Sequence, residues 1–98
     1  MNLFLFIVWC ASVAGDTKTY ITAASTKEEA LSQIPYWFRQ DYEIRYATLD
    51  EAIDLGCVYY KDSIVVFEDK FFEYNHNTNR MEYDSDVNYT IHPELYTD

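Results

Sequence analysis

The sequence predicts a small α+β domain with a mostly antiparallel sheet, in the order ββαβα followed by a three-stranded β-meander. Three observations support this. The first 24 residues are rich in strand-forming side chains, two helix starts share a capping pattern, and alternation with a period of two begins at Ser63. One or two helices are expected to pack on one face of the sheet. The 98 residues suit a single domain, residues 1–84, followed by an acidic irregular tail, residues 85–98.

Residues 3–26 have two interpretations, of which the first is a β-hairpin. Residues 4–13 are mostly β-branched or aromatic, which favours a strand. They are apolar at odd and even positions alike, so this strand is expected to be covered on both faces. Gly15 and Asp16 suit the tight turn that follows, and residues 17–24 form the returning strand.

The second interpretation makes residues 1–15 a cleaved signal peptide. Residues 3–14 carry no charge and end in small side chains, as at a signal-peptidase site. However, no Lys or Arg precedes them, where such signals normally carry positive charge. Cleavage would also remove Cys10 and leave Cys57 as a lone thiol. These two arguments favour the hairpin.

The first helix is predicted over residues 26–34. Ser25 or Thr26 is expected to accept a hydrogen bond from a backbone N–H three residues on, while Glu28 or Glu29 reaches back. This reciprocal pattern is typical of a capping box, and it predicts where the helix begins.

Pro35 then ends or kinks this helix, because proline lacks the N–H that a helix interior requires. Trp37 and Phe38 continue its apolar face, so they are expected to dock on the sheet. A third strand follows over residues 42–47.

The second helix begins at Thr48, with Glu51 at the capping-box position three residues later. Its end has two interpretations. Gly56 caps the helix, or the helix continues to Tyr60 along one apolar face.

The last part of the domain alternates with a period of two. It predicts strands over residues 64–67, 71–75 and 80–83, joined by turn-forming residues. In the third of these strands Met81 and Tyr83 are expected to point inward. The result is an antiparallel meander with one face in water.

The charge of the chain restricts its partners. Seventeen acidic and seven basic residues give a net charge of −10. Direct binding to nucleic acid or to an anionic membrane is not expected, because the basic footprint is missing. The charge favours a protein partner with a basic surface.

No catalytic, metal or cofactor site is predicted. His76 and His92 have no further ligand at metal-binding spacing, and two glycines do not build a phosphate loop. Cys10 and Cys57 are expected to be free buried thiols rather than a disulfide. We therefore expect a protein that is not an enzyme.

Tyrosines interleave with carboxylates in the second half of the chain. Tyrosine offers large rigid contact area with a polar tip, and carboxylates spaced along strands resemble phosphates. The predicted binding surface consists of Tyr60, Asp62, Glu68, Asp69, Glu73, Tyr74, Glu82, Tyr83, Asp84, Asp86 and Tyr89.

In size, acidity and lack of a catalytic set, the chain resembles small phage- or virus-encoded proteins that inactivate a host factor by binding it, such as anti-CRISPR and anti-restriction proteins. The resemblance implies a cytoplasmic inhibitor or adaptor that binds a basic, nucleic-acid-handling host protein and mimics nucleic acid. A free strand edge at residues 17–24 or 80–84 is expected to allow pairing with a second copy. The alternative is a small secreted protein, glycosylated at Asn88, that acts on an extracellular receptor or enzyme.

Overall fold

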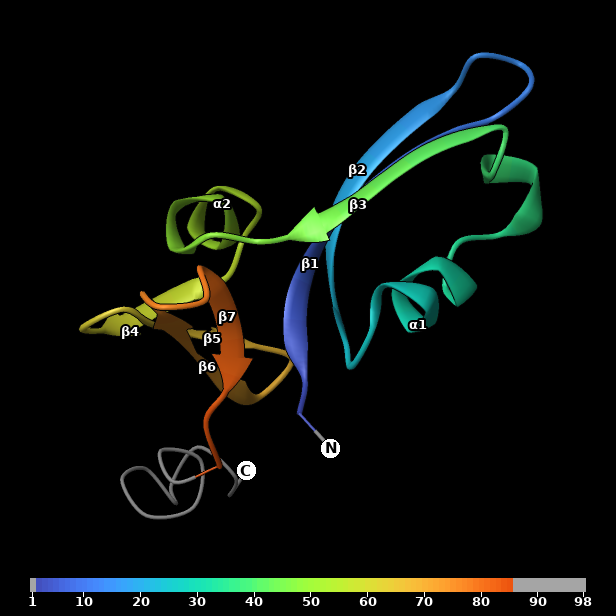
Figure 1. Ribbon diagram of the computed structural model, residues 1–98. Helices are drawn as coiled ribbons and strands as arrows, with labels where there is room; N and C mark the ends of the chain where they lie inside the picture. Colours follow the sequence, from blue (N-terminus) through green and yellow to red (C-terminus); the bar gives the residue numbers. More distant parts are fainter. Residues whose placement is uncertain (1, 86–98) are drawn as a thin grey trace.

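The computed structural model describes residues 2–85 of the chain, in which strand β1 (Phe4–Ala11) pairs with three other strands of the sheet (Figure 1). One edge of β1 pairs antiparallel with β2 (Thr17–Ala24). The other edge pairs first with β3 (Asp41–Tyr46) and then, at Phe4, with β7 (Arg80–Tyr83). The strand order is β2-β1-β7-β6-β5-β4, with β3 attached to β1 beside this path. The predicted α+β class with a mostly antiparallel sheet is confirmed.

Strands β1 to β3 form a long twisted unit, here called the ribbon (Figure 1). Residues 12–15 turn the chain between β1 and β2, with Gly15 at a φ of 92°. A side chain is rarely tolerated there, so glycine suits the turn. The Ser12 N–H donates to the Asp16 carbonyl at 2.8 Å and closes the hairpin.

The two faces of β1 contact different helices. Its even-numbered side chains, such as Phe6 and Val8, pack towards α1 (Lys27–Ser32). Leu5 and Ile7, on the odd face, join a cluster that includes residues of α2 (Leu49–Asp54). The expectation that β1 is covered on both faces is confirmed. The expectation that the helices pack on one face is wrong, because each helix covers a different face of this doubly apolar strand (Figure 1).

Both predicted N-caps are present. The Thr26 hydroxyl accepts from the Glu29 N–H at 3.1 Å, and the Glu29 carboxylate accepts from the Ser25 backbone. Thr48 and Glu51 form a complete capping box. A local hydrogen-bond pattern therefore fixes the start of each helix.

Helix α2 ends before Gly56, which adopts a φ of 103°. The continuation of this helix to Tyr60 is wrong, because strand β4 (Val58–Lys61) follows instead. With β5 (Ile64–Phe67), β6 (Lys70–Asn75) and β7, this strand forms a unit here called the meander. It has four strands where the sequence predicts three.

A short 3-10 helix, η1 (Tyr36–Phe38), follows Pro35. Phe38 is half-buried and packs against the cluster of Val8, Cys10 and Ile34, so it docks on the sheet as expected. Trp37 does not dock on the sheet, since 59% of it is exposed. A single 3-10 turn presents its side chains in different directions, so neighbouring aromatic residues separate here.

Strand β7 lies between β1 and β6, so the prediction that residues 80–84 form a free edge is wrong. Strand β2, in contrast, lies at one end of the strand order. Within residues 2–85, no helix is long and apolar enough to cross a membrane.

Candidate interaction surface

The structure gathers five of the predicted binding residues around one cavity of about 440 Å³ on the meander. Strands β6 and β7 position them, and residues of the connecting loop complete the wall. The five residues are Glu73, Tyr74, Glu82, Tyr83 and Asp84.

The strand register places the side chains of these residues on two different faces of the β6–β7 pair. Glu73 lies directly opposite Glu82, so both carboxylates are on the same face of the β6–β7 pair. Tyr74 and Tyr83 belong to the opposite face and pack against the core cluster that contains Phe72. The interleaved sequence therefore produces an acidic face and an aromatic face. The tyrosines contribute much of their area to packing within the molecule.

The rings on the inner face have defined partners. Tyr83 meets Phe72 edge to face, with ring centroids 6.0 Å apart. The Tyr74 hydroxyl donates to the side chain of Asn79 at 2.9 Å, while its ring contacts His76. These contacts hold the loop after β6 against the sheet.

Like charges lie close together on the acidic face. Burial and the neighbouring Asp84 carboxyl raise the pKa of Glu73 above its ordinary value. The Thr78 hydroxyl donates to the Glu82 carboxylate at 2.9 Å. Like charges directly opposite one another destabilise a sheet. The free protein therefore holds these carboxylates at some expense of stability.

Two arginines near the meander, Arg45 and Arg80, contact groups outside the acidic face. The ion pairs among residues 2–85 are those of Arg45 with Glu43 and Glu51. Arg80 opens β7, and its guanidinium lies 4.0 Å from the centre of the Tyr46 ring. This contact connects β3 and β7, the two strands that pair with the same edge of β1.

The other predicted residues are more scattered. Asp62 lies in the β4–β5 turn, whereas Glu68 and Asp69 form the β5–β6 turn at the other end of the meander. Tyr60 is half-buried and packs edge to face on Phe71. Asp86, Asn88 and Tyr89 lie outside the described residues, as does almost all of the predicted acidic tail.

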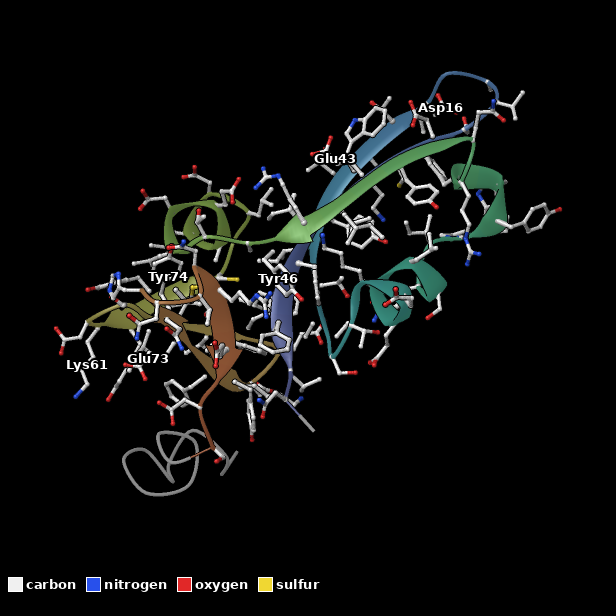
Figure 2. All side chains as sticks on the ribbon, in the orientation of Figure 1. Asp16, Glu43, Tyr46, Lys61, Glu73 and Tyr74 are labelled. Carbon is white, nitrogen blue, oxygen red and sulfur yellow. The ribbon has the colours of Figure 1, made fainter. Side chains whose placement is uncertain are left out.

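A second exposed region lies at the far end of the ribbon, which sequence reasoning did not identify. Val13, Tyr36 and Trp37 are 83%, 80% and 59% exposed, and they line a cavity of about 600 Å³. Figure 2 shows Asp16 at this end of the molecule and Glu73 and Tyr74 at the other. The signal in the sequence was the aromatic pair directly after Pro35, because proline interrupts the helix that would have buried it.

The described residues show no group of three or more potential metal ligands from His, Cys, Asp and Glu. Cys10 and Cys57 are free and buried. Burial raises the pKa of the Cys57 thiol to about 11, so this thiol stays protonated at neutral pH and is a poor nucleophile.

Comparison of the chain with protein-family models, with curated proteins and with solved structures found no match in any of the three.

Proposed function

We propose that this protein is a non-enzymatic binding protein, an inhibitor or adaptor whose meander binds a basic, nucleic-acid-handling protein inside the host cell. The observation that supports it best is the acidic face, on which Glu73 and Glu82 lie directly opposite each other beside Asp84. Strands hold these carboxylates in fixed positions, and fixed spacing is what a groove built for phosphates recognises.

The electrostatics of the face support the same proposal. Burial and the neighbouring Asp84 carboxyl raise the pKa of Glu73 in the free protein, and a cationic partner would favour the charged form of this side chain. The guanidinium of Arg80 lies over the aromatic rings of Tyr46 and Phe4. A lysine or arginine of the partner would place a positive charge beside Glu73 and Glu82.

The test begins by isolating the partner from the host with the tagged full chain and identifying it. The purified partner is then titrated with this protein at salt concentrations between about 50 and about 500 mM. Affinity should fall steeply with salt, because several charges pair across the interface. Double-stranded DNA should compete for the partner if the carboxylates take the place of phosphates. A flat salt dependence would contradict the proposal.

The matched variants remove equal charge from the two ends of the molecule. The triple variant Glu73→Gln, Glu82→Gln and Asp84→Asn should weaken binding at least tenfold. Its control, Asp16→Asn, Glu28→Gln and Asp41→Asn, changes net charge equally but lies within residues 1–47, which contain the ribbon and α1. If both triple variants weaken binding alike, net charge rather than the acidic face determines affinity.

A further inference from the structure

The outer edge of β2 presents unpaired backbone groups. The carbonyl of Leu5 in β1 accepts from Ala47 after β3, and the carbonyl of Leu3, just before β1, accepts from Tyr83 of β7. The backbone N–H and C=O groups of the even-numbered residues of β1 therefore point to β2. Even residues of β1 lie opposite even residues of β2. The odd residues of β2, including Thr19 and Ile21, therefore direct their N–H and C=O groups away from the sheet.

Among residues 2–85 no element pairs with this part of the edge. At the far end of the strand the edge is closed, because the Gln33 side chain donates to the Ala23 carbonyl at 3.3 Å. The open stretch is thus residues 17–21. Open strand edges are templates for a further strand.

A cavity of about 310 Å³ lies beside this open stretch. Cys10, Lys18 and Tyr20 line it from the sheet, and Pro35, Trp37 and Phe38 line it from the connection that contains η1. No described residue of β3 contributes to the lining, so the cavity lies on the β2 side of the ribbon. Its walls are mostly apolar and aromatic.

The charge at the cavity defines what fits it. Lys18 carries the only charge among the described residues of the lining, and its ammonium group lies 4.9 Å from the centre of the Tyr20 ring. Lys18 and Tyr20 are two residues apart on an extended strand, so their side chains share one face. An added strand would present its own alternate side chains to the same pair.

We propose that β2 binds an extended peptide segment of a partner protein by strand addition. The segment pairs with residues 17–21, places an apolar side chain beside Tyr20 and places a carboxylate against Lys18. Backbone hydrogen bonds supply affinity, while the cavity and Lys18 supply specificity. This surface is separate from the acidic face, since β2 and β6 are not neighbours in the sheet.

The test uses a phage-displayed library of random dodecapeptides, selected on the immobilised full chain. Enriched peptides are synthesised with a fluorescein label and titrated by anisotropy. We expect them to share an aromatic or aliphatic residue two positions from an Asp or Glu. Hydrogen exchange should show new protection of the Thr19 and Ile21 amides when the peptide binds.

Two pairs of variants separate the edge from the cavity. Thr19→Pro removes an N–H that points away from β1, so the β1–β2 ladder stays intact, whereas Thr19→Val keeps that N–H. Lys18→Glu reverses the charge at the cavity, and Lys61→Glu makes the same change on β4 at the other end of the strand order. Thr19→Pro and Lys18→Glu should each weaken peptide binding about tenfold or more, and the two controls should stay within about twofold.

Circular dichroism of each variant verifies that it remains folded before binding is compared. Three results would overturn the proposal. They are the absence of any enriched peptide, peptide affinity that is unaffected by Thr19→Pro in a folded variant, and a wild-type dimer that Thr19→Pro converts to monomers. The last result, measured by sedimentation, would assign the edge of β2 to a second copy of this chain.

Discussion

The ribbon half and the meander half of the molecule share one strand but expose different chemistry. Residues 1–47 contain five acidic and four basic side chains, a net charge of −1. Residues 48–98 contain twelve acidic and three basic side chains, a net charge of −9. The ribbon ends in exposed apolar and aromatic side chains, whereas the meander carries opposed carboxylates on β6 and β7.

This difference does not reflect two separate domains. The largest core cluster combines Leu5 and Ile7 of β1 with Val65, Phe72 and Met81 of the meander. Two polar contacts also connect the halves, because Arg45 of β3 pairs with Glu51 of α2 and Arg80 of β7 stacks on Tyr46 of β3. One folding unit thus presents two distinct surfaces at opposite ends (Figure 2).

The largest effect should come from removing residues 2–15. Without β1, each half loses the strand against which its helix and its neighbouring strands pack. The expected loss exceeds the roughly 5–15 kcal/mol that stabilises a typical domain. Thermal unfolding followed by circular dichroism should show no cooperative transition. A truncated chain that folds cooperatively would show that β1 is dispensable and would support the signal-peptide interpretation, which the intact mass of the native protein tests directly.

The next largest effect should come from large-to-small changes in the two cores. Phe6 and Phe72 are both fully buried, one on the α1 side of β1 and the other in the meander. Phe6→Ala and Phe72→Ala should each reduce the free energy of unfolding by about 3–5 kcal/mol. Both variants should unfold in one transition in urea. Two separate transitions in either variant would indicate that the halves fold independently.

An intermediate effect is expected at Glu51, whose hydrogen bond to Arg45 and capping contacts with Thr48 lower its pKa to about 2. Because the folded-state pKa lies below the ordinary value of 4.5, this stabilisation is present above pH 4.5 and is lost as the pH falls towards 2. Glu51→Gln should reduce the free energy of unfolding by about 1–2 kcal/mol at pH 7. Urea titrations at several pH values should show the two proteins converging near pH 2. A constant difference down to that pH would mean that ionisation of Glu51 contributes nothing.

A smaller effect is expected at Arg80, whose guanidinium lies over the Tyr46 ring at the boundary between the halves. Arg80→Met keeps an unbranched apolar stem and removes the charge. The free energy of unfolding should fall by about 1 kcal/mol, the contribution of a partly desolvated cation–π contact. Arg80→Lys serves as the control that keeps the charge. Unchanged stability of Arg80→Met would show that the apolar stem of Arg80, and not its charge, stabilises the contact between β7 and β3.

The smallest effect is expected at Glu73, where substitution should raise the free energy of unfolding rather than lower it. Its pKa is raised in the folded state, so the folded state is relatively favoured below the unfolded-state pKa and loses this advantage as the pH rises through the folded-state pKa. Glu73→Gln should therefore stabilise the protein slightly at pH 7, by about 0.5 kcal/mol or less, and not at pH 3. Parallel urea titrations at the two pH values provide the measurement. Destabilisation at pH 7 would mean that the Glu73 carboxylate is well paired in the free protein.

The sequence by itself determined the features that depend on neighbouring residues. Thr26 and Thr48 start helices because their hydroxyl groups accept from N–H groups three residues on. Strands β5, β6 and β7 lie at, or within one residue of, the ranges predicted from strand-forming runs and turn residues. Such signals act over a few residues, so no knowledge of the fold is needed to interpret them. The expected alternation of buried and exposed side chains is wrong for β5 and β6, because neighbouring residues such as Phe71 and Phe72 are both fully buried, in different clusters.

Only the tertiary structure decided which surfaces meet. Strand β1 is apolar on both faces, so its sequence does not specify which helix covers which face. Tyr74 alternates with carboxylates along the chain, and it points inward because β6 turns that face towards β1 and α2. Trp37 is exposed because Pro35 redirects the chain before the tryptophan reaches the sheet. For β1 and for the β6–β7 pair the deciding contacts join residues far apart in the sequence, whereas periodicity and capping report only on neighbours.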